Sequence, residues 1–245
     1  MKIVVIIQAR MSSTRLPGKI MLPLQGKPML QNISERIARA KYIDDLIIAT
    51  SIDETDDIVE DFCLNKGIKY FRGSLNNVLE RYYKCAVKES ADIIIRCTAD
   101  NALIDATIID EAVETYISYK PDYLSYKASL PVGMRVEVFS FDALEKAYNE
   151  ASDPECLEHV TPYIIKNPSK FCVLFYQDRS DDDYSTMRFT IDTPEDYKFA
   201  KSIYETYTTN DFSYEQILCL LYEHPEFMDI NRNIIQKHLK YKGES

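Results

Sequence analysis

The residues best suited to chemistry lie in one short segment, QARMSSTRLPGK, which spans residues 8–19. Its cations and hydroxyl groups could surround phosphate oxygens, with the loop amides as further hydrogen-bond donors. These side chains belong to Arg10, Ser12, Ser13, Arg15 and Lys19. No acidic residue precedes Glu35, so residues 1–34 carry a charge of +5 while the rest of the chain carries −15. The pattern indicates a local site for a small polyanion.

Two common phosphate-binding motifs are missing from this segment. A Walker A loop requires G-x-x-x-x-G-K-[ST], and a dinucleotide-binding loop requires G-x-G-x-x-G. Here Gly18 is followed by Lys19 and Ile20, and no glycine precedes it. The sequence therefore excludes a P-loop ATPase and a dinucleotide-dependent dehydrogenase. A solvated basic loop is the alternative interpretation, but the position directly after a predicted strand favours a functional site.

The first hundred residues alternate short β-branched runs with amphipathic stretches, which is typical of βαβ units and a parallel sheet. Strands are predicted at residues 2–8, 45–51, 68–73 and 92–99. Helices are predicted from Pro28, over residues 53–66 with Asp53 as N-cap and Gly67 as the stop, and through residues 78–87. Because the strands are continuous Ile and Val runs, we expect helices on both faces of the sheet.

After residue 105 the alternation is less regular. Helices are predicted at 107–118, 141–150, 154–166, 195–207 and 213–223, and strands near Tyr123 and at 135–139, 171–177 and 187–191. Neither a Pro-, Gly- or Ser-rich linker nor an internal repeat divides the chain. We therefore expect one α/β domain over residues 1–230, followed by a charged tail over residues 231–245.

The predicted parallel sheet also locates the site, because ligands of open α/β sheets bind beyond the carboxyl ends of the strands. The residues at those ends are Gln8–Arg10, Thr50–Asp53, Arg72–Ser74 and Thr98–Asn101. We expect these loops to share one crevice. Asp100 then lies at the same edge of the sheet as the basic segment, where it could hold Mg²⁺, an ion that prefers carboxylate and phosphate oxygens.

A second carboxylate, Asp192, follows the late MRFTI run and precedes Pro194. Its position has two interpretations: a metal ligand, or the N-cap of a helix that begins at Pro194, which is worth about 1 kcal/mol. The triple Asp181-Asp182-Asp183 looks like the D-x-D metal motif of glycosyltransferases. It lies in a connector between strands, where a charge run is usually a solvated turn, and we do not assign it to a metal.

Composition excludes several other classes of protein. The chain has 245 residues, a net charge of −10 and a pI near 4.9, which argues against a nucleic-acid partner. Its six cysteines form no C-x-x-C motif, so a zinc ribbon is not expected and a reduced, cytoplasmic setting is the simplest. The apolar run at residues 3–7 is too short to span a bilayer, and no membrane partner is expected.

Longer strings along the chain resemble a known family. QARMSSTRLPGKIMLPLQGKPML is similar to the N-terminal signature of bacterial cytidylyltransferases of spore coat and surface polysaccharide biosynthesis, relatives of the CMP-Kdo and CMP-sialic acid (acylneuraminate) synthetases. Further similar strings are FRGSLNNVLERYY, RCTADNALID, PVGMRVEVFSFDALEKA, EHVTPYII and RFTIDTPEDY. The resemblance covers residues 1–230. It implies a glycosyltransferase-A-like, Rossmann-like fold, with a mostly parallel central sheet flanked by helices and a mixed C-terminal part.

The resemblance also implies an activity, the transfer of CMP from CTP to a small-molecule acceptor with release of pyrophosphate. It implies Mg²⁺ as the cofactor, held by Asp100 and Asp192, and leaves a homodimer open. An acceptor oxygen would attack the α-phosphorus, with catalysis by Arg10, Arg15, Lys19 and Asp100. The nucleotide-binding residues would be Gln8, Ala9, Arg10, Ser12, Ser13, Arg15, Lys19, Arg72 and Ser74.

The acceptor side departs from the family pattern. Arg135 stands where an acid is expected, and Asn101, Ala102 and Ala106 replace a Cys and two Pro. With Arg135, Glu137 and His159 as acceptor-binding residues, an acceptor that carries a carboxylate or phosphate is expected, although Arg135 could equally pair with a surface acid. A nucleotidyltransferase for another nucleoside triphosphate stays open as an alternative. A glycosyltransferase that uses a nucleotide sugar would carry a D-x-D motif at the fourth strand, which Asp100-Asn101-Ala102 does not supply. A non-catalytic nucleotide-binding subunit would be expected to lack Arg15, Lys19 or Asp100, and all three are present.

Overall fold

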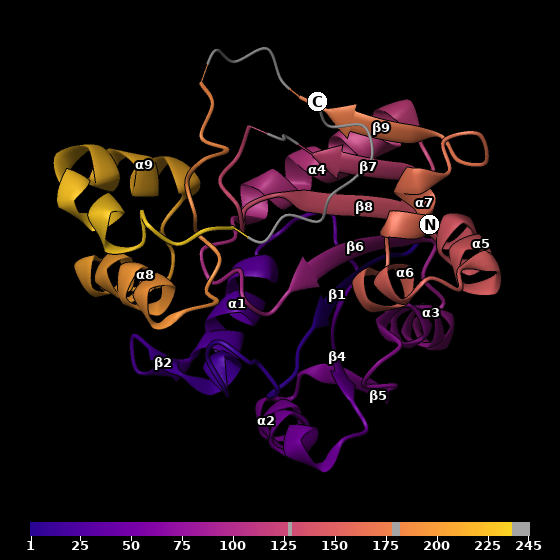
Figure 1. Cartoon of the computed structure of the whole chain (residues 1–245), viewed down its shortest axis with the longest axis horizontal. Coiled ribbons are helices and arrows are strands. Elements are labelled where there is room, and N and C mark those ends of the chain that lie inside the picture. The colour runs from indigo at the N-terminus through magenta and orange to yellow at the C-terminus, as the bar shows by residue number, and fades with distance from the viewer. Residues whose placement is uncertain (127–128, 178–181, 237–245) are drawn as a thin grey trace.

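A seven-stranded sheet forms the centre of the protein, with strand order β5-β4-β1-β6-β8-β7-β9 (Figure 1). The computed structural model describes residues 1–126, 129–177 and 182–236. The strands are β1 (Ile3–Gln8), β4 (Asp45–Ser51), β5 (Lys69–Gly73), β6 (Ile93–Thr98), β7 (Tyr123–Tyr126), β8 (Val136–Ser140) and β9 (Val173–Tyr176). The strands β5, β4, β1 and β6, which come first in this order, are parallel to one another. Strand β8 is antiparallel to its neighbours β6 and β7, and β9 is parallel to β7. The predicted mostly parallel sheet with a mixed C-terminal part is confirmed.

Helices cover both faces of this sheet, as the continuous apolar strands require. They are α1 (Met29–Ile37), α2 (Asp57–Lys66), α3 (Val78–Glu89), α4 (Ala106–Tyr119), α5 (Phe141–Glu150), α6 (Pro154–His159), α7 (Pro162–Lys166), α8 (Pro194–Thr206) and α9 (Tyr214–Glu223). Val5 and Ile7 pack into one core with α1, α2, α4, α8 and α9. Val4 and Ile6 pack into a second core with α3, α5 and α7.

Local sequence signals set several element ends. Gly67 ends α2 in the left-handed conformation, with φ of 65°. Asp53 caps a short 3-10 turn, Glu54–Asp56, which precedes α2, so the predicted N-cap serves the turn and the α-helix starts later. Two further 3-10 turns are Lys19–Met21 and Pro225–Ile230, and a small hairpin joins β2 (Pro23–Leu24) to β3 (Lys27–Pro28).

The prediction of one helix over residues 154–166 is wrong, because the chain turns at Val160. This residue has φ of 73° and ψ of −62°, and Thr161 N donates to His159 O at 2.9 Å, which closes a γ-turn. Pro162 begins α7 directly afterwards, where its fixed φ suits the first helical position.

The predicted strand at residues 187–191 does not join the sheet. It lies beside the loop that precedes β8, where Val132 N donates to Met187 O at 2.9 Å and Phe189 N donates to Val132 O at 2.8 Å. A Cβ on Gly133 would lie 2.6 Å from Thr190 N, so the two backbones approach closely only because residue 133 is glycine. This contact leads the segment to Asp192.

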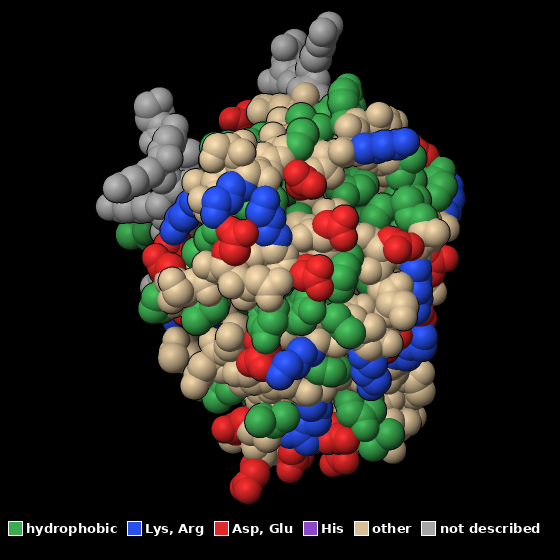
Figure 2. Space-filling model, turned by 90° about the vertical axis from the view of Figure 1, so that its right-hand side faces the viewer, with side chains coloured by type: hydrophobic (Ala, Val, Ile, Leu, Met, Phe, Trp, Pro, Cys, Tyr) green, Lys and Arg blue, Asp and Glu red, His purple; other side chains and the backbone are tan. Residues whose placement is uncertain are grey.

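The surface over α3, α5 and α6 carries interspersed positive and negative side chains (Figure 2). None of the helices in the described part of the chain combines the length and the apolar composition that a membrane span requires.

Candidate active site

The loops after β1 and β4 are tied together at the carboxyl edge of the sheet. Gln8 lies in register between Ala49 of β4 and Thr98 of β6. The buried Asp56 carboxylate accepts from Met11 N at 2.7 Å and from Ser51 N at 3.2 Å. The basic loop, residues 9–18, is therefore anchored at its start to the β4–α2 connection.

Gly18 turns the end of the basic loop inward. It adopts φ of 67° immediately before the 3-10 turn Lys19–Met21 and donates to Met11 O at 3.0 Å. As a result Lys19 is 8% exposed, whereas Arg15 stays on the surface of the loop. Ser13 Oγ accepts from Leu16 N at 3.4 Å, and Ser12 is exposed.

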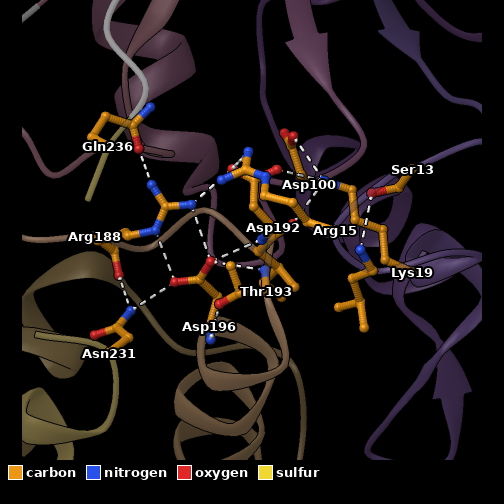
Figure 3. A network of polar contacts seen from close by, with 12 residues as sticks. Ser13, Arg15, Lys19, Asp100, Arg188, Asp192, Thr193, Asp196, Asn231 and Gln236 are labelled. Carbon is orange, nitrogen blue, oxygen red and sulfur yellow. Dashed lines mark hydrogen bonds and ion pairs between the residues drawn. The ribbon is translucent and has the colours of Figure 1, made fainter. Parts of the chain in front are cut away.

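The Lys19 ammonium joins the two carboxylates that were assigned to the metal (Figure 3). Its Nζ donates to Asp100 Oδ2 at 3.2 Å, to Asp192 Oδ1 at 2.9 Å and to the carbonyl of Ile191 at 2.7 Å. An ammonium has three donor hydrogens, so these three contacts use all of them. Asp100 is held in turn by Thr98 Oγ1, and its carbonyl accepts from Ile191 N at 2.8 Å.

Asp192 faces three cations. Its Oδ2 lies 2.9 Å from Arg15 Nη2 and 2.7 Å from Arg188 Nη2, while Oδ1 faces Lys19. Burial by itself raises the pKa of Asp192, but the charges and hydrogen bonds of Lys19, Arg188 and Arg15 outweigh it and hold that pKa below its ordinary value. This carboxylate is therefore ionised and strongly neutralised in the free protein.

Sequence analysis assigned no role to Arg188 or Asp196, although both lie in the quoted RFTIDTPEDY string. Asp196 is fully buried and completes a capping box with Thr193 at the start of α8. The T-x-x-D spacing before an apolar run is a readable signal for that box. The pairing of Arg188 with Asp192, four residues later, and with Asp196, eight residues later, had no such local signal, since Arg188 precedes the helix.

The two carboxylates suit a hard divalent cation. Both reach one cationic atom, Lys19 Nζ, so they lie close enough to share a charge between them. In the described residues no group of three or more His, Cys, Asp or Glu could form a metal cage of protein ligands alone. Mg²⁺ is usually held by one or two carboxylates together with substrate phosphates, and this site supplies that number.

The other predicted nucleotide-binding residues surround this centre less closely. Arg10 is exposed and lies 3.8 Å from Glu158, and Ala9 is buried behind the basic loop. The carbonyl oxygen of the Gln8 side chain is buried and has no hydrogen-bond partner among the described residues. Arg72 pairs with Glu60 and with Asp57, which lies 2.7 Å away, and it also donates to the Ser51 carbonyl. Ser74 Oγ accepts from Asn77 N at 3.0 Å and so closes the turn before α3.

The predicted acceptor residues lie on the β8 side of the sheet. Glu137 forms an ion pair with Arg96 and accepts from Tyr123 Oη at 2.6 Å and Thr161 Oγ1 at 2.8 Å. His159 precedes the γ-turn, and burial lowers its pKa. Arg135 Nε donates to Leu130 O at 3.3 Å, at the end of β8 that adjoins the site.

The rejected acidic triple stays outside the centre. Asp182 and Asp183 are not hydrogen-bonded to Lys19 or Arg15, and Asp183 accepts from Ser185 N at 2.8 Å, as in a solvated turn. Asp181 lies outside the described residues.

A mostly parallel α/β sheet with a basic loop and two carboxylates at its carboxyl edge has the arrangement of a class of proteins whose ligands bind beyond the ends of the strands. Comparison with known sequences identifies the family: the cytidylyltransferase family model matches residues 4–227, so the chain belongs to the cytidylyltransferases. It is accordingly a nucleotidyltransferase.

Individual relatives agree with this family. The chain is 35% identical over 230 residues to the Bacillus subtilis spore coat polysaccharide biosynthesis protein SpsF, and the match covers 91% of this chain and 95% of that protein. It is 34% identical over 118 residues to 3-deoxy-manno-octulosonate cytidylyltransferase of Geobacter metallireducens, which covers 48% and 46% of the two chains. A solved cytidylyltransferase from Leptospira borgpetersenii superposes with a TM-score of 0.88 and 33% identity, covering 97% of this chain and 100% of that one.

Proposed function

We propose that this cytidylyltransferase transfers CMP from CTP to a sugar or sugar-acid-like acceptor, with Mg²⁺ and release of pyrophosphate, in the synthesis of a surface polysaccharide or another glycan. The family membership supports the nucleotide. The named roles of two relatives, spore coat polysaccharide synthesis and 3-deoxy-manno-octulosonate cytidylyl transfer, support the class of acceptor.

One observation carries the proposal, the convergence of Asp100 and Asp192 on the Lys19 ammonium at 3.2 and 2.9 Å. It brings the 3-10 turn that follows the basic loop, the end of β6 and the segment before α8 to one point. The same point has cations that can bind phosphate oxygens and carboxylates that can hold a metal. A transferring phosphoryl group needs both kinds of charge at once.

The chain's own residues would divide the work as follows. Arg15 and Lys19 bind the triphosphate and stabilise the negative charge that develops on the departing pyrophosphate. Asp100 and Asp192 hold Mg²⁺, which when bound supplies further neutralisation of phosphate charge. The loop amides and the hydroxyls of Ser12 and Ser13 orient the phosphates by hydrogen bonds.

The acceptor side is consistent with an anionic acceptor. Arg135 directly precedes β8, whereas Arg10 of the basic loop lies 3.8 Å from Glu158. The Glu137 carboxylate is already engaged by three donors. We therefore assign charge recognition of the acceptor to Arg135, and to Glu137 the support of Arg96.

Pyrophosphate release tests this function directly. We expect release with CTP, Mg²⁺ and a 3-deoxy-2-keto sugar acid, and little release with ATP, GTP or UTP or in the presence of EDTA. Asp100→Asn should lower turnover by about 10²–10³-fold, because it removes a charged ligand of the Mg²⁺ that neutralises phosphate charge. Wild-type turnover in Asp100→Asn, or equal activity with all four nucleotides, would contradict the proposal.

A further inference from the structure

The three cations around Asp192 differ in how firmly they are held. Arg15 comes from the basic loop and keeps 33% of its side chain exposed. Arg188 comes from the segment beside Gly133 and keeps 6% exposed. A guanidinium on an exposed loop can move to another anion at little cost, whereas a buried guanidinium with fixed partners cannot.

Arg188 is fixed by Asp196 on two atoms. Its Nε lies 2.8 Å from Asp196 Oδ1, and its Nη2 lies 3.0 Å from Asp196 Oδ2. Asn231 Nδ2 joins the pair by donating to the Arg188 carbonyl at 2.9 Å and to Asp196 Oδ1 at 3.2 Å. The remaining nitrogen, Nη1, donates to Gln236 (Figure 3). All three guanidinium nitrogens therefore have partners within the protein.

The same Asp196 carboxylate also holds the backbone at Asp192. The amides of Asp192 and Thr193 both donate to Asp196 Oδ2 at 3.0 Å. The main chain of Asp192 is thus bound by Asp196, and its Oδ2 is bound by Arg188 at 2.7 Å. With two such restraints the carboxylate has one orientation, in which Oδ1 points to Lys19 and Asp100.

We propose that Arg188 and Asp196 form a positioning pair that presents Asp192 Oδ1 to the metal, while Arg15, on the exposed basic loop, is the cation that leaves Asp192 for the nucleotide. This inference rests on the proposed function, since it takes Asp192 as a metal ligand. Neither residue of the pair contacts substrate. Their effect is exerted through Asp192, as residues behind a ligating carboxylate commonly act.

Metal binding without turnover tests this role. Mn²⁺ is titrated into full-length protein with saturating α,β-methylene-CTP and no acceptor, and free Mn²⁺ is read by electron paramagnetic resonance. Arg188→Met should weaken Mn²⁺ binding by about 10- to 100-fold, the usual effect of removing a partner of a metal ligand. Arg188→Lys keeps the charge and should lose less. Affinity for the nucleotide analogue in EDTA should stay near the wild-type value.

Two further variants separate positioning from general loosening of the fold. Arg36→Met is a matched control, because Arg36 is also buried and donates to four backbone carbonyls, those of Leu103, Ile104, Asn210 and Phe212. It should leave Mn²⁺ affinity unchanged. In an Asp192→Asn background, Arg188→Met should cause no additional loss, because effects that pass through one residue are not additive.

The outcomes distinguish this inference from the function on which it rests. Wild-type Mn²⁺ affinity in Arg188→Met overturns the positioning role and leaves the proposed function intact. An equal loss in Arg36→Met, or an additive loss in the double variant, also overturns it. If the wild-type protein binds the analogue but no Mn²⁺, the metal assignment is wrong and the inference is overturned with it.

Discussion

Lys19 is the residue on which the free site depends most. Its ammonium offsets both carboxylates from a nearly buried position, where charges are poorly solvated and a partner's loss is costly. Under the proposed function, the same charge also faces the phosphates during transfer. Lys19 therefore has two sets of anionic partners, and the metal and the nucleotide should bind in a linked manner.

Removing this ammonium should have opposite effects on binding and on catalysis. Lys19→Met is expected to raise Mn²⁺ affinity in the absence of nucleotide, because a cation that competes for Asp100 and Asp192 is lost. Turnover with CTP should fall by about 10²–10³-fold, since one charge facing the leaving group is removed. Paramagnetic titration and pyrophosphate release measure the two quantities.

Lys27→Met serves as the control for this prediction, because Lys27 pairs with Glu35 in the same N-terminal region but makes no contact with either carboxylate. It should change neither measurement. A weaker Mn²⁺ affinity in Lys19→Met would show that Lys19 does not offset the two carboxylates.

Glu137 provides a prediction on pH. Burial raises the pKa of Glu137, but Arg96 and the hydrogen bonds from Tyr123 and Thr161 lower it by more. The pKa of Glu137 in the folded protein therefore lies below its ordinary value. A carboxyl group whose pKa is depressed by folding stabilises the fold at pH values above its pKa in the unfolded chain, about 4.3. This stabilisation is lost as the pH falls through the pKa of the group in the folded protein.

Glu137→Gln should accordingly reduce the free energy of unfolding by about 3–5 kcal/mol at pH 7, since it leaves the Arg96 charge buried and unpaired. The difference from wild type should shrink as the pH falls below 4.3, where Glu137 of the unfolded chain takes up a proton. Urea unfolding at pH 7 and pH 4 measures it. A difference that is constant over this range would contradict the depressed pKa.

At the scale of elements, the extended segment 187–191 is what carries Asp192 to the site. It is held to the loop before β8 by Val132, which bonds to Met187 and Phe189. Gly133 permits this contact, with φ of 102° and no room for a Cβ against the backbone of Thr190. Displacing the segment would therefore move Asp192 and Arg188 together.

Gly133→Ala tests this dependence. The added Cβ would clash with backbone atoms of Thr190, which cannot move away as a flexible side chain could. We therefore expect the free energy of unfolding to fall by clearly more than the roughly 1–2 kcal/mol that a non-glycine residue costs in the left-handed region. Mn²⁺ affinity with the CTP analogue should fall as well.

Gly67→Ala is the control, because Gly67 also has a positive φ but faces open space. It should cost about 1–2 kcal/mol and leave metal affinity unchanged. If both variants behave alike in thermal unfolding and metal binding, the close approach at Gly133 has no role in placing Asp192.

At the scale of the whole molecule, charge is distributed unevenly, with a net −10 overall but three cations, Arg10, Arg15 and Lys19, in the segment that follows β1. The other two cations of residues 1–34 lie elsewhere, since Lys2 pairs with Asp45 at the opposite end of the sheet and Lys27 pairs with Glu35. The face over α3, α5 and α6 has mixed signs (Figure 2). Segments from both ends of the chain meet at the site, since Lys19 contacts Asp192 and Asn231 contacts Arg188. We propose that residues 1–230 form one domain, and Asn231, at the start of the predicted tail, is buried against it.

Thiol reactivity tests whether the domain opens as one unit. Burial raises the pKa values of Cys63, Cys85 and Cys97 to about 12 and also raises that of Cys156, so these thiols are protonated and shielded at pH 8. Cys172 and Cys219 are exposed. With an aromatic disulfide reagent we expect two fast equivalents and four slow ones that share one rate constant. Distinct rates for Cys63 and Cys85 would indicate that the two cores open separately.

The sequence alone determined those features that depend on neighbouring residues. Continuous apolar runs gave the four parallel strands nearly to the residue, and Gly67 marked the end of α2. The same local signals were insufficient at Val160, where a helix-like pattern conceals a turn, and at residues 187–191, where an extended segment lacks a sheet partner. Local propensity specifies extended backbone but not the strand with which it pairs.

The tertiary structure decided which charges meet. The sequence suggested Arg15, Lys19, Asp100 and Asp192 from their places after predicted strands. The structure brought Lys19 to Asp192 across 173 residues of chain and gave Asp192 the restraint of Arg188 and Asp196. Such pairings depend on long-range packing, which no spacing in the sequence encodes. They fix the orientation of each carboxylate, and that orientation determines what the site can bind.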